Sequence, residues 1–473
     1  MPRVSRPRLI ALFSALVAGG ALAVAVYHVS RIAPIGTAYA AKILCSGVFV
    51  SGRDAQPVID QDVMADVHPL LRFVSPTVDR ARRRASARFL GLALREAQYR
   101  PGLGCALALG KAPEELAQAR GAPAATALAE PWPAGPPEPG VDAAQLRGAV
   151  DAAFTEAHAG GFRRTRAVVV VHHGRIVAER YAPGFGPETP QIGWSMTKTV
   201  TAALIGVLVR DGKLSLHSDR LLPQWRAAGD ARSAITLDQL LRMTTGLAFD
   251  ETYGDPLSDV TRMLLETGDG SAFAADKPLE AAPGTRWRYS SGTSYLLSRV
   301  LHDAWPEDTV GRARKALLDR IGMRSAALES DAAGVPVGAA FMYASARDWA
   351  RFGQFLLQDG VWNGERILPE GWVGYMSTAT PQAPRKDFGA HLWVRVPPPF
   401  DSATPVELPS DAVHMAGHEG QFVSVIPSRG LVVVRLGLSR PEQVWNQEAF
   451  LASVVAAFPA PRSAMLSPTA AAH

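Results

Sequence analysis

Several patterns are missing from this sequence, and each absence excludes a class of protein. No block of lysine and arginine is interleaved with aromatic residues, and the formal net charge is only +5, so no nucleic-acid partner is expected. No Gly-x-Ser-x-Gly elbow occurs, which argues against an α/β-hydrolase. The chain also contains no internal repeat, so a repeat architecture is not predicted.

A metal site is not predicted either. The sequence has no His-Glu-x-x-His motif, and the adjacent His172 and His173 have no third ligand at a familiar spacing. We therefore interpret His172-His173-Gly174 as the turn of a β-hairpin rather than as a metal-binding pair.

The N-terminus has the pattern of a membrane anchor. Arg3, Arg6 and Arg8 precede an uncharged run from Leu9 to Tyr27, which is about long enough to cross a bilayer. The basic residues predict a cytoplasmic N-terminus, with the rest of the chain facing the periplasm or the cell exterior from the inner (cytoplasmic) membrane. A cleaved signal peptide is the alternative, and Ala38-Tyr39-Ala40 has the form of a cleavage site, but it lies well beyond the apolar run.

Cysteine is scarce, and the two residues present lie in one region. Cys45 and Cys105 both fall on the exported side of the predicted anchor, where an oxidising compartment would allow them to pair. A disulfide would brace a segment that has little core of its own. Two unpaired buried thiols are the alternative, because sequence does not give the distance between the residues.

Composition divides the chain into five segments. We predict a basic segment with a transmembrane anchor (residues 1–31), an accessory region that braces the rest (32–120), a linker rich in proline, alanine and glycine (121–141), a main domain (142–458) and a disordered tail (459–473). Within the accessory region, Leu44–Val50 has the pattern of a short strand and Asp79–Gln98 that of an arginine-rich helix.

The main domain is predicted to have an α+β fold. Strand patterns stand at its two ends, a hairpin around His172-His173-Gly174 and a second one formed by Gln421–Ile426 and Leu431–Leu436. Between them the apolar residues from about Thr236 to Trp372 recur mostly at helical spacing. An antiparallel sheet flanked by helices would therefore pack beside a mostly helical subdomain, and the junction of the two favours a binding site.

The strongest chemical signal is the pair Ser195 and Lys198. Lys198 is one of seven lysines and the only one with a serine three residues before it. Residues three apart share one face of a helix, and the apolar run Val200–Val209 predicts that a helix starts here. Burial and the positive end of the helix dipole would favour a neutral lysine, which can act as a base and make the serine a nucleophile.

Two further stretches could complete a site with Ser195. Tyr289 stands in a turn before a helix, where its phenol could move a proton if a cation such as Lys198 lowered its pKa. The segment from His418 to Gln421 begins a strand, and its glycine, Gly420, would let the backbone approach a substrate and aim an N–H group at a developing oxyanion. A core aromatic residue and an ordinary turn histidine are the alternatives for Tyr289 and His418.

In combination these motifs resemble the serine β-lactamase and penicillin-binding protein superfamily. Ser195-x-x-Lys198 matches its nucleophile motif, Tyr289-Ser290-Ser291 its Tyr-x-Asn motif, and His418-Glu419-Gly420 the His-x-Gly form of its Lys-Thr-Gly motif. Other stretches are similar to the 6-aminohexanoate-dimer (nylon-oligomer) hydrolase group of the class C-like branch. These stretches are Leu240–Leu247, Ala344–Gly353, Asp359–Gly364 and Gly417–Gln421.

The resemblance implies a β-lactamase-like fold and acyl transfer without a metal or an organic cofactor. Ser195 would form the acyl-enzyme, Lys198 and Tyr289 would share the proton transfers, and the N–H groups of Ser195 and Gln421 would form the oxyanion hole. Two residues depart from the β-lactamase pattern. Ser291 replaces an asparagine that would contact substrate or lysine, and His418 replaces a lysine with a fixed positive charge.

The sequence thus predicts a serine hydrolase for small amides or esters. A D-alanyl-D-alanine carboxypeptidase or β-lactamase is the second hypothesis, and a non-catalytic binding protein on the same fold is the third. The acidic loop after Phe249 could form part of the substrate rim, with Asp250 and Glu251 attracting an amine-bearing substrate; a solvated loop is the alternative. The oligomeric state is not predicted.

Overall fold

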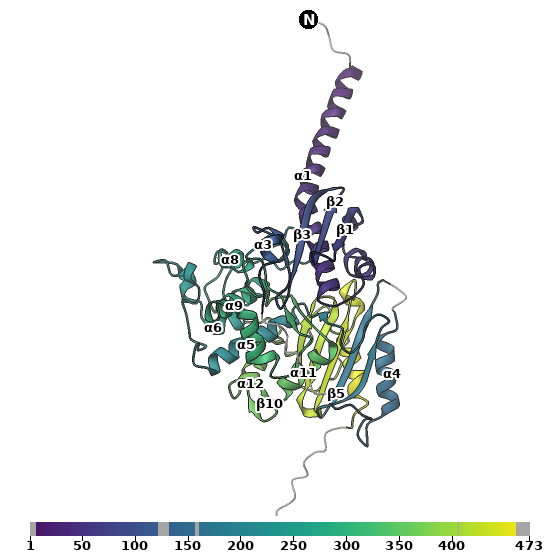
Figure 1. Cartoon of the computed structure of the whole chain (residues 1–473), viewed down its shortest axis with the longest axis vertical. Coiled ribbons are helices and arrows are strands. Elements are labelled where there is room, and N and C mark those ends of the chain that lie inside the picture. The colour runs from purple at the N-terminus through teal and green to yellow at the C-terminus, as the bar shows by residue number, and fades with distance from the viewer. Residues whose placement is uncertain (1–5, 122–131, 157–159, 405, 460–473) are drawn as a thin grey trace, which may run out of the picture.

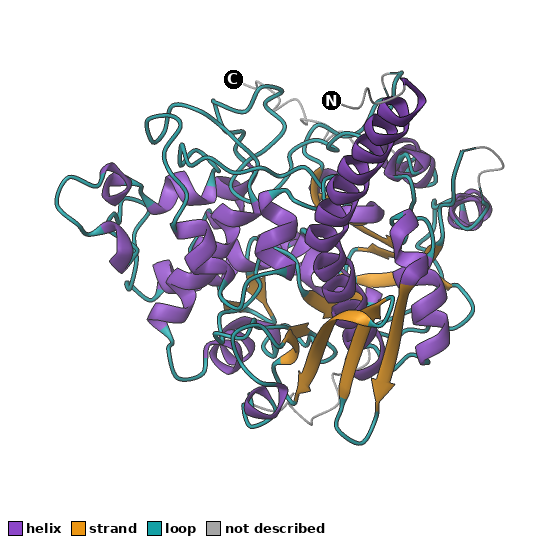
Figure 2. Ribbon diagram, turned by 90° about the horizontal axis from the view of Figure 1, so that it is seen from above, coloured by secondary structure: helices purple, strands orange, loops and turns teal. Residues whose placement is uncertain are grey.

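A computed structural model describes residues 6–121, 132–156, 160–404 and 406–459, and these form three parts. Figure 1 shows a sheet with helices on its faces, a mostly helical part beside it, and a long N-terminal helix that projects from the body. Viewed from above, the helices of the second part gather on one side and the strands on the other (Figure 2). This is the predicted α+β, β-lactamase-like architecture.

The central sheet is antiparallel and is built from both ends of the main domain. Its strand order is β12-β13-β14-β5-β6. The bounds are β5 Thr165–His172, β6 Arg175–Tyr181, β12 Val413–Gly417, β13 Gln421–Ile426 and β14 Leu431–Gly437. Both predicted hairpins are present in this sheet. The valines of β5 alternate between its faces, because successive side chains of a strand point in opposite directions.

Helices cover both faces of this sheet. One face packs against α4 (Ala143–Ala153) and α13 (Gln447–Val455), and the other against α11 (Ala346–Leu357). Asp142 starts α4 as predicted, because its carboxylate accepts hydrogen bonds from two backbone N–H groups of the first turn.

The helical part surrounds α5 (Met196–Arg210), of which thirteen of fifteen residues are buried. A helix that is apolar on nearly every side belongs inside a protein, and α5 packs against the sheet and against α9 (Ser291–Ala304). The other helices are α6 Leu237–Leu241, α7 Asp259–Leu265, α8 Gly270–Ala275, α9 Ser291–Ala304, α10 Thr309–Ala313 and α12 Trp372–Ser377. The short strands are β7 Gln191–Ile192, β8 Ala327–Leu328, β9 Met342–Ala344, β10 Val361–Trp362 and β11 Glu365–Arg366.

The accessory region is a four-stranded antiparallel sheet packed on α1 (Arg6–Phe49). Its strands are β1 Val74–Asp79, β2 Arg84–Phe89, β3 Leu92–Arg100 and β4 Gly104–Leu107, and two short helices, α2 Ala55–Pro57 and α3 Pro113–Leu116, flank them. Two secondary-structure predictions are wrong here. Leu44–Val50 continues α1 to Phe49, and Asp79–Gln98 contains strands, because alternate residues of β2 are buried against α1.

Helix α1 has two environments. The large apolar side chains described between Phe13 and Tyr27 are highly exposed, whereas most residues from Ala33 to Val48 are buried in the main hydrophobic core. Among the described residues, one helical segment, Phe13–Phe49, is long and apolar enough to cross a membrane by length and composition, a test that a signal sequence also passes. Cys45 of α1 is joined by a disulfide to Cys105 of β4.

The predicted linker and tail are only partly described. Of the linker, residues 122–131 lie outside the described residues, while Trp132 donates a hydrogen bond to the Gly174 carbonyl and Ala134 bridges to Ile176 of β6. Of the tail, residues 460–473 lie outside the described residues.

Candidate active site

Ser195 is the N-cap residue of α5, and its carbonyl accepts a hydrogen bond from the backbone N–H of Lys198. The turn that carries it is tight. Trp194 adopts a positive φ of 47°, and a Cβ atom at Gly193 would lie 2.2 Å from the ring of Trp349. Only glycine fits at that approach, so the backbone around Ser195 is held by packing on α11.

Lys198 lies one helical turn further on and is buried. Its Nζ lies 2.9 Å from Ser195 Oγ, and it donates further hydrogen bonds to Ser291 Oγ (3.0 Å) and to the Ala339 carbonyl (2.9 Å). Burial lowers the pKa of Lys198 to about 8, although the negative charge of Glu251 acts in the opposite direction. About a tenth of this amine is therefore neutral at pH 7 and able to accept a proton, and this fraction grows toward pH 8.

Tyr289 reaches the nucleophile from the turn before α9. Its phenol is a hydrogen-bond partner of Ser195, and Lys198 Nζ lies 5.1 Å from its ring centroid. Its ring stacks on Trp393 at 5.6 Å and meets Phe388 edge-on at 5.8 Å. The expected lowering of the Tyr289 pKa is wrong. Burial and the charge of Glu251 raise this pKa, so the phenol keeps its proton.

Ser291 connects Lys198 to an acidic residue of a distant loop. Its hydroxyl accepts the bond from Lys198 and donates to Glu251 Oε1 at 2.5 Å, while its backbone N–H donates to Glu251 Oε2 at 2.7 Å. Tyr253 also donates to Glu251, at 2.8 Å. Glu251 thus lies behind the Ser195–Lys198 pair rather than only on a solvated rim. It accepts a hydrogen bond from the hydroxyl of Ser291, the residue that stands where the resembling family has asparagine.

Asp250 lies apart from this network although it precedes Glu251. It is exposed, and its carboxylate accepts a hydrogen bond from the backbone N–H of Thr252, while its own N–H donates to Asp259. Hydrogen bonds from Thr252 lower the pKa of Asp250. The two carboxylates that the sequence grouped as one acidic rim therefore have different surroundings.

His418 lies across from Trp194 and is paired with an acid that the motifs did not indicate. Its Nδ1 is 2.6 Å from Glu442 Oε1. Burial lowers the pKa of His418, but the hydrogen bond to Glu442 and the charges of Glu419 and Glu442 outweigh it and raise the pKa above its ordinary value. His418 stands where the resembling β-lactamases have a positively charged lysine. Because its pKa is raised, the imidazole partly replaces that positive charge.

Glu419 ties this segment to the nucleophile turn. It is buried, adopts a positive φ of 62°, and accepts hydrogen bonds from Trp194 Nε1 (3.2 Å) and from Arg440 Nε (2.6 Å). Arg440 in turn donates to Tyr39 of α1 and to backbone carbonyls of the accessory region. The accessory region is thereby connected to the residue next to Ser195.

Gly420 and Gln421 complete the start of β13. Gly420 has a φ of 84°, and a Cβ atom there would lie 2.6 Å from the Arg435 guanidinium. The buried Gln421 side chain exchanges hydrogen bonds with the backbone of Gly437, donating at 2.7 Å and accepting at 3.0 Å. Its side chain therefore fixes β13 to β14, and its backbone N–H stays the predicted oxyanion donor.

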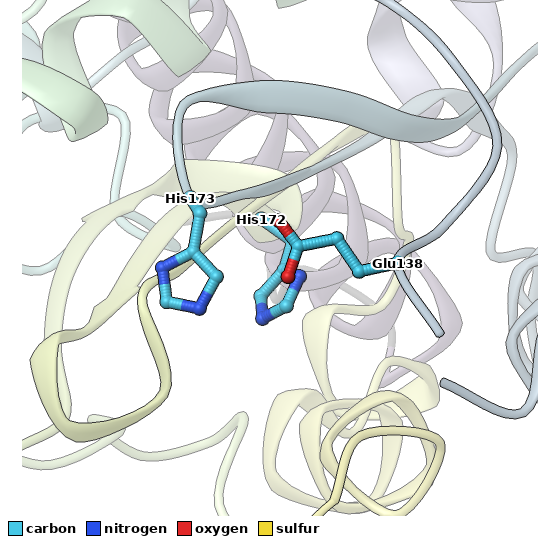
Figure 3. A group of neighbouring side chains, drawn as sticks. All are labelled: Glu138, His172 and His173. Atoms are coloured by element: carbon cyan, nitrogen blue, oxygen red, sulfur yellow. The ribbon is translucent and has the colours of Figure 1, made fainter. Parts of the chain in front are cut away.

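The paired histidines lie at the other end of the sheet, because His172 pairs with Leu431 at the far end of β14. Figure 3 shows the Glu138 carboxylate beside the His172 ring, with His173 on the adjacent turn. Ligand atoms of the three residues all lie within 4.8 Å of one another, a spacing that could hold a metal ion. The fold thus brings Glu138, from the segment before α4, beside a histidine pair that has no third ligand at a familiar sequence spacing. Burial, and to a lesser extent His173, lowers the pKa of His172.

The structure thus brings Ser195, Lys198, Tyr289, Ser291 and Glu251 into one network, with His418 close by. Sequence reasoning missed Glu442, Arg440, Trp393 and the Ala339 carbonyl. None of these has a fixed spacing from a motif, so no sequence signal could have indicated them.

Comparisons with known proteins agree with this fold. A family model described as Beta-lactamase matches residues 150–452. The 6-aminohexanoate-dimer hydrolase of Paenarthrobacter ureafaciens is 24% identical over 220 residues, which cover 44% of this chain and 56% of that protein. The matched segment is thus little more than half of that relative.

Solved structures show the same fold. EstCE1, titled a hydrolase with promiscuous acyltransferase activity, has a TM-score of 0.53 at 18% identity and covers 67% of this chain and 97% of its own. A D-stereospecific amidohydrolase from Streptomyces sp. has a TM-score of 0.50 at 18% identity, with 67% and 98% covered. Because the family model spans well over half of the 473 residues and the fold agrees with it, the chain belongs to the beta-lactamase family, whose members are hydrolases.

Proposed function

We propose that this protein is a serine hydrolase that cleaves an amide or ester bond of a small-molecule substrate through an acyl-enzyme on Ser195. The observation that carries the proposal is the 2.9 Å contact between Ser195 Oγ and the buried Lys198 amine, whose pKa is lowered to about 8. The likeness to 6-aminohexanoate-dimer hydrolase supports an amidase or esterase reaction. No metal or organic cofactor takes part in the proposed steps.

In the first step Ser195 Oγ attacks the substrate carbonyl, and its proton passes to neutral Lys198. The carbonyl oxygen becomes an oxyanion, which the N–H groups of Ser195 and Gln421 would stabilise. When the tetrahedral intermediate collapses, the bond to the leaving group breaks. Tyr289 suits the role of donor to that leaving group, because its raised pKa keeps the phenol protonated. Protonated Lys198 then restores the proton of Tyr289.

Hydrolysis of the acyl-enzyme reverses these roles. Water attacks the acyl carbonyl and gives its proton to neutral Lys198, and Ser195 Oγ leaves and takes a proton back. Lys198 is the better base in both steps, since burial favours the neutral form of an amine and the protonated form of a phenol.

We also propose that the catalytic domain is held at the outer face of the cytoplasmic membrane by α1. The exposed apolar part of α1 and the Cys45–Cys105 disulfide support an exported location, because disulfides persist in oxidising compartments.

A cell-wall D-alanyl-D-alanine carboxypeptidase or β-lactamase is the second candidate. The raised pKa of His418 favours it, because an imidazolium beside the site could bind a substrate carboxylate. The third hypothesis is a non-catalytic binding protein. It is disfavoured because a protein that only binds would not need all three of Ser195, Lys198 and Tyr289.

Covalent labelling of the detergent-solubilised full chain separates these functions. We expect a fluorophosphonate probe to label the protein and a fluorescent penicillin not to label it, and Ser195→Ala should abolish labelling. Labelling by both probes would favour the cell-wall function. Labelling by neither, with native circular dichroism, would overturn the hydrolase proposal.

A further inference from the structure

An apolar cavity of about 460 Å³ lies between α1 and the catalytic site. Its lining includes Val29, Ile32 and Gly36 of α1 and Leu264 of α7, and it reaches Trp194 and His418. The size is that of a small-molecule binding site. Nothing in the proposed chemistry at Ser195 requires a cavity of this extent, so it calls for a separate explanation.

The position of this cavity along α1 is distinctive. Val29 follows directly on the exposed apolar residues of that helix, and Tyr39, at the other end of the lining, is a hydrogen-bond partner of Arg440. Ten residues of helix span about 15 Å. The cavity therefore runs from the part of α1 suited to a bilayer toward the residues that fix the nucleophile turn.

The two ends of the cavity differ in polarity. The end along α1 and α7 is lined mainly by aliphatic side chains, whereas the other end carries His418, Glu419 and Arg440. Trp194, which precedes Ser195 in the chain, lines the cavity there, and the Tyr253 ring stacks on His418 at 5.1 Å beside it. A molecule with a long apolar tail and a polar group matches this distribution.

We propose that the cavity receives the acyl chain of a long-chain ester or amide drawn from the membrane, with the carbonyl placed at Ser195. This inference rests on the proposed hydrolase function and specifies its substrate class. A helix that anchors the protein and also lines the acyl-chain site would allow an amphiphile to pass from the bilayer to the nucleophile without crossing water. Each buried methylene would then improve binding about fourfold until the cavity is full.

The test compares p-nitrophenyl acetate with p-nitrophenyl laurate, using the full chain in lipid nanodiscs. We expect kcat/KM for laurate to exceed that for acetate by about a hundredfold, consistent with several buried methylenes. Gly36→Phe should fill the cavity from α1, since a Cβ atom there makes only an ordinary 3.4 Å contact with Leu71. It should reduce laurate turnover at least tenfold and leave acetate turnover within about twofold.

Gly20→Phe is the matched control, because it adds the same side chain to the same helix where nothing lies within 4 Å. It should change the turnover of neither ester. Leu264→Trp, from α7, provides a second filling variant if Gly36→Phe does not fold. Equal turnover of acetate and laurate by the parent protein, or equal losses for both in the filled variants, would overturn the acyl-chain site.

Failure of the hydrolase proposal gives a different result. If neither ester is cleaved and the fluorophosphonate does not label Ser195, the proposed function fails. In that case calorimetry still tests whether the cavity binds an acyl chain. The affinity of Ser195→Ala for laurate is compared with that of Ser195→Ala/Gly36→Phe. Binding weakened at least tenfold by Gly36→Phe supports the acyl-chain site, and equal binding rejects it.

Discussion

Lys198 Nζ lies 2.9 Å from Ser195 Oγ while its whole side chain is buried. The two residues are one helical turn apart, so the start of α5 alone sets their separation. Burial then determines the chemistry, because it holds the Lys198 pKa at about 8 and leaves a base beside the hydroxyl.

The pH dependence of acylation follows from this pKa. A lysine with a lowered pKa is protonated and inactive as a base below it, so kcat/KM for p-nitrophenyl acetate should rise about tenfold per pH unit up to about pH 8 and then level off. Stopped-flow acylation rates across this range measure the profile. A rate that is flat through pH 8 would show that Lys198 is not the base.

Lys198 and Tyr289 should behave as one unit in a mutant cycle. Lys198→Ala and Tyr289→Phe should each slow acylation by about a hundredfold or more, because each interrupts the same proton path. The double variant should lose less than the product of the two single losses. Fully multiplicative losses in the kinetic cycle would show that the two groups act independently.

Glu251 and Asp250 provide a matched pair of variants. The charge of Glu251 raises the Lys198 pKa, so Glu251→Gln should move the midpoint of the pH profile to lower pH, while Asp250→Asn should leave it unchanged. Glu251→Gln should also slow acylation, because Gln offers one acceptor oxygen to the two donors of Ser291.

The same pair tests the substrate rim predicted from the sequence. If the loop attracts amines, both variants should raise KM for an amine-bearing ester and leave its neutral analogue unchanged. A shift of the pH midpoint in Asp250→Asn as large as that in Glu251→Gln would contradict the conclusion that Glu251, and not Asp250, raises the Lys198 pKa.

Local patterns predicted the parts of the fold that depend on neighbours in the chain. The hairpins of the central sheet and the start of α5 follow from apolar period and turn residues, and the structure contains all of them. In the accessory region the local pattern failed. Small residues such as Ala85 and Ala87 carry a weak strand signal, and their burial against α1 decides the structure.

The site shows the same division. Ser195 and Lys198 are linked by spacing, so the sequence indicates both, whereas Glu251 meets Ser291 only because the loop folds back over α9. Glu442 reaches His418 in the same non-local way. The direction of the Tyr289 pKa was also beyond the sequence, since it depends on burial rather than on which residues are near in the chain.

Glu442 should control the charge of His418. Removing its carboxylate in Glu442→Gln leaves burial as the larger influence, so the His418 pKa should fall and its positive charge should be lost near neutral pH. KM for p-nitrophenyl hemisuccinate, which bears a carboxylate, should then rise several-fold relative to p-nitrophenyl butyrate between about pH 5 and 8. Equal KM changes for the two esters would show that His418 does not recognise the substrate carboxylate.

The accessory region should be part of the folding unit rather than a removable brace. Lys42 of α1 forms a buried ion pair with Glu329, which also accepts hydrogen bonds from Ser46 and from the backbone N–H of Cys105. Lys42→Met would leave that carboxylate buried without its cation, and such a loss typically costs about 3–5 kcal/mol.

Urea denaturation of the detergent-solubilised protein measures this effect. We expect the unfolding midpoint of Lys42→Met to fall, and Lys42→Met/Glu329→Gln to recover part of the loss, because a neutral amide is cheaper to bury than an unpaired charge. Removing residues 1–28, which precede the buried part of α1, should leave the midpoint unchanged, whereas removing residues 1–121 should abolish cooperative unfolding. A cooperative, active product of the longer truncation would show that the main domain folds without α1.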